Sequence, residues 1–411
     1  MNTTTLLPVM MTNAELIARE EKHSAHNYHP LPVVLERGDG VFVWDVEGKR
    51  YFDFLSAYSA VNQGHCHPRI INALIEQAKR ITLTSRAFHN NEFANFSAYI
   101  TQYFGYDRVL PMNTGAEGVE TALKLCRKWA YQKKGIPQNE ALILVCDQNF
   151  HGRTISIVSA STDPDSRRDF GPYTPGFLVI PYNDTLALAE ALKNPNIAGF
   201  LVEPMQGEAG VNVPDEGFLA EAYALCKQHN VLFIADEIQT GIARTGKLLA
   251  CDHEGVKPDI LILGKALSGG VYPVSAVLSS DEVMLCIKPG EHGSTFGGNP
   301  LACHVAREAL EVVNDEKLAE NAARLGQILR DKLRAMHHPK IKLVRGKGLL
   351  NAIVINEDDG ISAWEICIRM MERGLLAKPT HGNIIRFAPP LVITEAQLLE
   401  CISIIEASLN A

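Results

Sequence analysis

Two residues in this sequence have the types and the setting that amine chemistry requires. Lys265 follows an apolar run at 260–263 and is surrounded by small residues and glycines, while Asp236 ends a second apolar run at 231–235. Burial lowers the pKa of a lysine and makes it a nucleophile that can form a Schiff base. A carboxylate can hold a pyridinium nitrogen in its protonated form. The pair therefore indicates pyridoxal phosphate chemistry, and an ordinary surface lysine after a strand is the alternative.

The segment after Asp236 allows two further interpretations of that carboxylate. Asp236 could cap a helix or bind a metal, but no cluster of His or Cys accompanies it, so we expect no metal site. Gln239 lies three residues further on and can hydrogen-bond a phenolic oxygen on the same ring. A solvated polar side chain is the simpler interpretation of Gln239 taken alone.

Two glycine-containing segments could bind phosphate. Residues 113–117 lead into a helix predicted over 117–131, and the free backbone N–H groups at a helix start attract anions. An ordinary capped helix is the alternative there. Residues 292–300 contain glycines that allow close approach of the backbone, and hydroxyl groups that can bond phosphate.

Two arginines could bind a substrate carboxylate. Arg153 follows Phe150 closely; Phe150 could stack on an aromatic cofactor, and Arg153 could bind a carboxylate bidentately. A core phenylalanine and a surface arginine are the alternatives. Arg386 lies within an apolar run, where a charge needs a partner. A substrate carboxylate or the carboxylate of Glu208 would serve.

These candidates need a scaffold, and the sequence predicts an α/β one. From about residue 56 to 310, apolar strand candidates alternate with helical patterns, which implies a largely parallel sheet covered on both faces. The strand candidates are 142–146, 198–202, 231–235, 260–263 and 274–278. Ligands of such sheets bind at the carboxyl ends of the strands, where Asp236 and Lys265 are expected.

Both ends of the chain predict a second, smaller α+β domain. Residues 40–51 alternate as half-buried strands do around a Glu-Gly turn. Beyond about residue 311, the pattern predicts helices near 315–336 and 362–373, an extended stretch at 341–355 and a last helix capped by Thr394. We therefore expect an N-terminal segment (1–55) that joins the small domain, a large cofactor-binding domain (56–310) and a C-terminal small domain (311–411).

Composition excludes several function classes. The net charge of −8 disfavours a nucleic-acid surface. Nine cysteines, an odd number without CxxC pairs, are typical of a reducing compartment. No apolar stretch has the length of a membrane span, and residues Met1 to Met11 lack the pattern of a transit peptide or a secretion signal. We expect a cytoplasmic protein that binds neither nucleic acid nor membrane.

Taken together, these segments resemble the class III aminotransferases of pyridoxal phosphate fold type I. The resemblance extends from His26 to Pro390 and is most specific at 59–68, 264–275 and 377–382, whereas 236–241 is shared across the class. It implies a large domain with a mostly parallel seven-stranded sheet flanked by helices, and a smaller α+β domain from both termini. It also implies pyridoxal 5'-phosphate as the cofactor.

The resemblance implies a role at the cofactor for most of the candidates. Lys265 would carry the cofactor and move a proton between the substrate carbon and the cofactor, with Asp236 on the pyridine nitrogen. Gln239 would bond the ring oxygen, and Phe150 would stack on the ring. The residues implied at the phosphate are Gly115, Ala116, Ser294 and Thr295. Thr295 resembles a residue that reaches in from the neighbouring subunit, which implies a homodimer with shared active sites, or a larger assembly of such dimers.

For the substrate, the resemblance is greatest to members that act on L-ornithine. Tyr28 and Arg153 would bind its α-amino and α-carboxyl groups, and Tyr58 would line the same pocket. The δ-amino group would pass to 2-oxoglutarate in a ping-pong reaction that gives glutamate and glutamate 5-semialdehyde. The semialdehyde would cyclise to pyrroline-5-carboxylate, as in arginine catabolism and proline biosynthesis. Arg386 would bind the α-carboxylate of 2-oxoglutarate and Arg153 the other one, while Glu208 would pair with Arg386 during the ornithine half-reaction.

Three alternatives remain open at this point. Another ω-aminotransferase would act on acetylornithine or 4-aminobutyrate, and acetylornithine presents an amide where Tyr28 would meet a free ammonium. An aminomutase or racemase of the same fold would keep Lys265 and Asp236 but would not depend on a keto-acid acceptor. A non-catalytic binding protein would have no need of the lysine, the aspartate and both arginines.

Overall fold

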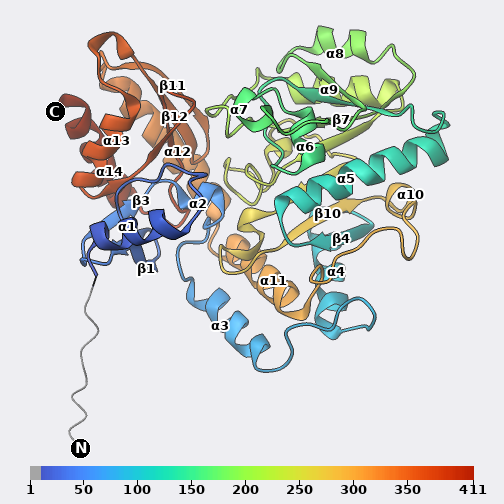
Figure 1. Ribbon diagram of the computed structural model, residues 1–411, viewed down its shortest axis with the longest axis horizontal. Helices are drawn as coiled ribbons and strands as arrows, with labels where there is room; N and C mark the ends of the chain where they lie inside the picture. The colour runs from blue at the N-terminus through green and yellow to red at the C-terminus, as the bar shows by residue number, and fades with distance from the viewer. Residues whose placement is uncertain (1–10) are drawn as a thin grey trace, which may run out of the picture.

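Two bodies of unequal size lie side by side in the computed structural model, which describes residues 11–411 (Figure 1). The larger one is built on a seven-stranded sheet and the smaller one on two four-stranded sheets. The prediction for residues Met1 to Met11 falls almost entirely outside the described residues. Among residues 11–411, no helix combines the length and the apolar character that crossing a membrane requires.

The seven-stranded sheet confirms the predicted fold class. Its order is β4 (Arg108–Met112), β10 (Ser275–Ser279), β9 (Ile260–Leu263), β8 (Leu232–Asp236), β7 (Ile197–Val202), β5 (Leu142–Cys146) and β6 (Phe177–Ile180). All neighbours are parallel except β10, which runs antiparallel to β4 and to β9. Each strand predicted from an apolar run lies within one residue of its observed position. Strands β4 and β6, which carry more exposed residues, were not predicted.

Helices cover both faces of this sheet because successive side chains of its strands point in opposite directions. On β5, Ile143 and Val145 pack with α5 (Gly115–Trp129) and α6 (Ile155–Ala160), while Leu144 and Cys146 pack with α8 (Thr185–Ala191) and α9 (Phe218–Gln228). The other helices of the larger body are α3 (Pro68–Ala78), α4 (Asn91–Phe104), α7 (Pro164–Arg167), α10 (Asp281–Met284) and α11 (Pro300–Asp315).

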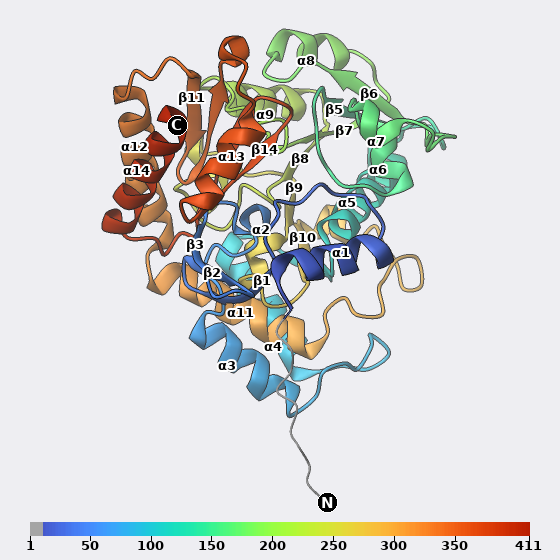
Figure 2. The same ribbon diagram turned by 60° about the vertical axis from the view of Figure 1, so that its left-hand side comes forward.

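The smaller body is assembled from both ends of the chain, as its blue and red segments show in both views (Figures 1 and 2). Strands β1 (Leu35–Asp39), β2 (Phe42–Asp45) and β3 (Arg50–Asp53) share a sheet with β13 (Leu375–Leu376). A second sheet contains β11 (Ile341–Lys347), β12 (Leu350–Ile355), β15 (Ile384–Phe387) and β14 (Lys378–Thr380). The helices of this body are α12 (Leu318–Ala335), α13 (Ala363–Glu372) and α14 (Glu395–Asn410), with α1 (Asn13–His23) near the N-terminus. The residue boundaries expected for the three parts stay a prediction.

Candidate active site

A cavity of about 180 Å³ lies where β7, β8 and β9 end. This is the edge of the sheet at which the sequence predicts a ligand site. The predicted site residues that line it are Gly115, Ala116, Phe150, Glu208, Asp236, Gln239 and Lys265. The structure therefore brings together residues spread over 150 positions of the sequence, from residue 115 to residue 265.

Lys265 enters the cavity just after β9. It starts the short 3-10 helix η3 (Lys265–Ser268) with a left-handed backbone (φ 45°), which turns the chain sharply at the strand end. Burial lowers the pKa of the Lys265 amine, and the charge of Arg386 adds to that effect, while Glu208 and Asp236 oppose it. The net shift is downward, so a larger fraction of the amine is neutral and nucleophilic than at the surface.

Asp236 ends β8 and is only 4% exposed. Its Oδ2 accepts a hydrogen bond from His151 Nδ1 (2.7 Å), and its Oδ1 accepts one from the backbone N–H of Ile238 (3.2 Å). Burial lowers the pKa of His151, but the hydrogen bond to Asp236 and the charge of that carboxylate outweigh burial and raise it. The His151 ring therefore holds the Asp236 carboxylate in position. The sequence analysis missed His151 because no local pattern links it to a residue 85 positions away.

Glu203 is a second acid in this wall that the sequence analysis missed. Its side chain is buried, and it accepts a hydrogen bond from the backbone N–H of Phe150 (3.0 Å). Burial raises the pKa of Glu203 to about 8, with Asp236 adding to the shift and His151 opposing it. Glu203 is therefore largely uncharged at neutral pH. The apolar strand end before Glu203 was the available sequence signal.

Arg386 and Glu208 form an ion pair at the edge of the cavity. Arg386 is 2% exposed, and its Nη1 lies 2.8 Å from Glu208 Oε1 and 3.2 Å from the carbonyl oxygen of Gly207. The same carboxylate oxygen accepts a hydrogen bond from Gln239 Nε2 (2.9 Å). Burial raises the pKa of Glu208, but Arg386 and Lys265 outweigh burial and lower it. The Glu208 carboxylate is therefore ionised and neutralises Arg386.

Tyr58 covers this ion pair from an unusual turn. The guanidinium carbon of Arg386 lies 5.1 Å from the centre of the Tyr58 ring. Four consecutive residues, Ser56 to Ser59, have positive φ angles between 46° and 72°. None of them is a glycine, so no sequence signal predicts this left-handed turn. Strain of this kind is typical of functional sites.

The start of α5 forms an anion site. Thr114 Oγ1 accepts a hydrogen bond from Glu117 N (3.2 Å), and the Glu117 carboxylate accepts one from Thr114 N (2.9 Å). Within residues 11–411, the backbone N–H groups of Gly115 and Ala116 have no hydrogen-bond partner, and both residues line the cavity. Ser294 lies next to this helix start, since its Oγ accepts a hydrogen bond from Asn113 Nδ2 (2.8 Å). The site fits a phosphate group.

Six predicted site residues are outside the cavity lining. Three of them, Tyr58, Ser294 and Arg386, lie beside the lining as described above, and the other three are exposed. Tyr28 is 63% exposed, and Arg153 is exposed with its guanidinium carbon 5.5 Å from the centre of the Phe150 ring. Thr295 is exposed as well and lies outside this chain's own cavity lining. Their contacts with substrate or cofactor stay predictions.

The residues of the cavity fit pyridoxal phosphate. Free N–H groups at α5 suit the phosphate, Asp236 suits the ring nitrogen and the amine of Lys265 suits the aldehyde carbon. Gln239 Oε1 is buried and has no hydrogen-bond partner within residues 11–411, which leaves it available to a ligand. A side chain at position 207 would displace this amide, because a Cβ there would lie 1.5 Å from Gln239 Oε1.

Comparisons with known proteins agree with this geometry. The sequence profile of the family described as aminotransferase class-III matches residues 23–409. A Drosophila melanogaster protein named mitochondrial ornithine aminotransferase is 63% identical over 97% of this chain and 92% of its own length. The solved ornithine aminotransferase of Toxoplasma gondii has a TM-score of 0.96 and 52% identity, covering 98% of this chain and 96% of the other. A solved acetylornithine aminotransferase from Elizabethkingia anophelis has a TM-score of 0.89 and 61% identity, covering 97% and 99%.

Proposed function

The chain belongs to the class III aminotransferases, and from that premise we propose that it transfers the δ-amino group of L-ornithine to 2-oxoglutarate with pyridoxal phosphate as cofactor. The products are glutamate and glutamate 5-semialdehyde, which cyclises to pyrroline-5-carboxylate. The Drosophila and Toxoplasma relatives, which carry the name ornithine aminotransferase, support this substrate. The ion pair between Arg386 and Glu208 is the structural observation that carries the proposal.

Each residue of the cavity has a task in this reaction. When bound, pyridoxal phosphate supplies a cationic ring that accepts the electron pair of a carbon–hydrogen bond. Lys265 Nζ would take the proton from the δ-carbon of the substrate and deliver it to the former aldehyde carbon of the cofactor, which its lowered pKa favours. Asp236 would keep the ring nitrogen of the bound cofactor protonated, while His151 holds that carboxylate in place. The N–H groups of Gly115 and Ala116 anchor the phosphate.

The ion pair explains how one pocket takes two different substrates. A free Arg386 would attract the α-carboxylate of ornithine and place the α-amine at the reacting position. With Glu208 on its guanidinium, Arg386 offers no net charge, and ornithine enters with its δ-amine first. In the second half-reaction, 2-oxoglutarate brings its own carboxylate to Arg386, which requires Glu208 to release it. Arg153, whose guanidinium lies near the ring of Phe150, would bind the other carboxylate.

We expect Glu208→Gln to change which amine is transferred. The amide keeps a hydrogen bond to Arg386 but removes the neutralising charge, so kcat/KM for δ-transfer should fall about 10–100-fold, about 1.4–2.8 kcal/mol in activation free energy. NMR of the reaction mixture separates pyrroline-5-carboxylate from 5-amino-2-oxopentanoate, the product of α-transfer. The half-reaction with 2-oxoglutarate should stay near the parent rate. Glu190→Gln, an exposed glutamate of α8, is the matched control, and an unchanged product ratio in the Glu208 variant contradicts the switch.

A single absorbance experiment tests the proposed function against its alternatives. The visible absorbance of the holoenzyme should disappear on adding L-ornithine and return on adding 2-oxoglutarate. An aminomutase or racemase would turn over without the keto acid. N-acetylornithine is a separate arm, because the Elizabethkingia relative is named for it. A kcat/KM at least about tenfold higher for N-acetylornithine than for ornithine would make the acetylated compound the substrate.

We also propose that two copies of the chain share their active sites. The resemblance at Thr295 supports this, together with the exposed position of that residue outside its own cavity. Light scattering of the purified protein gives the mass, and a monomer at micromolar concentration would refute the proposal.

The compartment and the division into parts are proposals as well. Nine free cysteines, of which only Cys66 is exposed, support a reducing compartment such as the cytoplasm. The Drosophila relative, in contrast, is named as mitochondrial. Cell fractionation decides between the two. We keep residues 56–310 as the large cofactor-binding part, and limited proteolysis near residues 55 and 310 tests those boundaries.

A further inference from the structure

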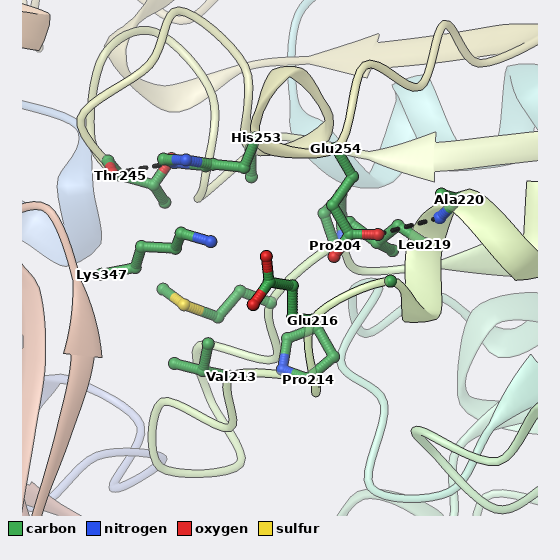
Figure 3. A pocket seen from close by; sticks show the side chains of 13 residues that line it. Pro204, Val213, Pro214, Glu216, Leu219, Ala220, Thr245, His253, Glu254 and Lys347 are labelled. Atoms are coloured by element: carbon green, nitrogen blue, oxygen red, sulfur yellow. Dashed lines mark hydrogen bonds between the residues drawn. The ribbon is translucent and has the colours of Figure 1, made fainter.

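Figure 3 shows the wall of a second cavity, of about 570 Å³. It lies next to the active site, because Met205 lines both cavities. Most of its wall comes from the larger body: the segment after β7, the start of α9 and the loop at 245–254. Lys347, the last residue of β11, closes it from the smaller body. The volume falls within the range of small-molecule sites.

Two opposite charges face the interior of this cavity. The ammonium group of Lys347 and the carboxylate of Glu216 are directed into the same space (Figure 3). Within the described part of the chain, neither group forms an ion pair, because no opposite charge lies within 4.0 Å of either one. Both charges are therefore free to pair with a ligand.

Two of the other polar side chains of the wall are already engaged, whereas Thr245 Oγ1 is buried and has no hydrogen-bond partner within residues 11–411. Glu254 Oε2 accepts a hydrogen bond from the backbone N–H of Ala220 (2.9 Å), at the start of α9. His253 Nε2 donates one to the carbonyl oxygen of Thr245 (3.1 Å). Burial, and then the charge of Lys347, lower the pKa of His253 to about 4, so its ring is neutral at physiological pH. Among the described residues, the wall thus offers one unpaired cation, one unpaired anion and the unpartnered hydroxyl of Thr245.

Apolar side chains form most of the remaining wall. They are Pro204, Met205, Val213, Pro214 and Leu219. An inorganic anion would meet Glu216 and a metal cation would meet Lys347, so neither suits the cavity. A zwitterion with an apolar substituent suits the cation, the anion and the apolar side chains of the wall.

We propose that this cavity binds a free α-amino acid with an apolar side chain, its carboxylate on Lys347 and its ammonium on Glu216. Such a ligand bridges the two bodies of the protein, because β11 and the segment after β7 belong to different sheets. It also contacts Met205, three residues before Glu208, and therefore the segment that carries the partner of Arg386. The proposal does not depend on which amine donor the enzyme uses.

Calorimetric titration of the holoenzyme with L-leucine tests the site. We expect saturable binding with a Kd of about 0.1–5 mM and no change in the visible absorbance of the cofactor. Lys347→Met and Glu216→Gln should each weaken binding at least about tenfold, because each leaves one charge of the ligand unpaired. N-acetyl-leucine lacks the ammonium group and leucinamide lacks the carboxylate. Each should bind to the parent protein as weakly as L-leucine binds to the two variants.

Controls and a charge exchange complete the test. Lys342→Met on β11 and Glu221→Gln on α9 remove exposed charges near the cavity and should leave the affinity unchanged. The double variant Lys347→Glu/Glu216→Lys should recover binding that each single reversal loses. The proposal is overturned by absent binding at about 20 mM L-leucine. Unchanged affinity in both Lys347→Met and Glu216→Gln would overturn the proposal as well. Binding that always alters the cofactor absorbance would also overturn it.

Discussion

Replacing Lys265 with alanine is expected to lower kcat by about 10⁴-fold or more, while the fold and the bound cofactor are retained. Lys265 is the amine of the cavity whose pKa is lowered by burial, so no neighbouring group can replace it as carrier and proton acceptor. Stopped-flow mixing with L-ornithine measures the loss of visible absorbance in a single turnover. Circular dichroism checks that the variant remains folded.

Two controls separate chemistry from structure in this experiment. Lys193→Ala removes an exposed lysine that pairs with Glu190 and should leave kcat within about twofold of the parent. A small primary amine such as methylamine, added to the Lys265 variant, should restore part of the rate by accepting the proton. Turnover at the parent rate in Lys265→Ala would exclude the assigned role.

Asp236→Asn is expected to lower kcat by about 10³-fold, about 4 kcal/mol in activation free energy. The amide can still accept the hydrogen bond from Ile238 N, so the backbone at the end of β8 keeps its position. The charge that holds the ring nitrogen protonated is lost. The pKa of His151 should fall as well, because burial lowers it once the carboxylate that raises it is gone. The single-turnover rate with L-ornithine is the measurement.

A cofactor analogue distinguishes the charge of Asp236 from its shape. Pyridoxal phosphate methylated on the ring nitrogen is permanently cationic. With this analogue, Asp236→Asn should react at least about tenfold faster than with the unmodified cofactor. Asp281→Asn, an exposed aspartate paired with Arg108, should behave as the parent. If Asp236→Asn reacts within about twofold of the parent, the ring nitrogen does not depend on this carboxylate.

The sequence predicted the parts of the fold that depend on local pattern. Buried parallel strands are almost entirely apolar, so β5, β7, β8 and β9 were located within one residue. Helix α5 begins two residues before the predicted start, at Gly115, because Thr114 and Glu117 form a capping box. The positions of Lys265 and Asp236 at strand ends followed from the same pattern.

The rest of the site depends on contacts between distant residues. His151 and Asp236 meet only because β5 and β8 lie in one sheet, and the charge state of Glu203 depends on its burial. The turn that presents Tyr58 uses left-handed angles at four non-glycine residues, against local preference. The cavity with Lys347 and Glu216 exists only because the two bodies pack together. None of these features leaves a periodic signal in the sequence.

The sheet that joins β3 to β13 has a consequence for how this chain is made on the ribosome. Phe52 pairs with Leu375, so the two strands are separated by 323 residues (375 − 52). At about 5–20 residues per second, the N-terminal strands leave the exit tunnel about 20–60 s before their neighbour is synthesised. During that interval β3 has an open edge, and an unpaired edge is a template for aggregation. Nascent chains of this enzyme are therefore expected to need chaperones until translation is almost complete.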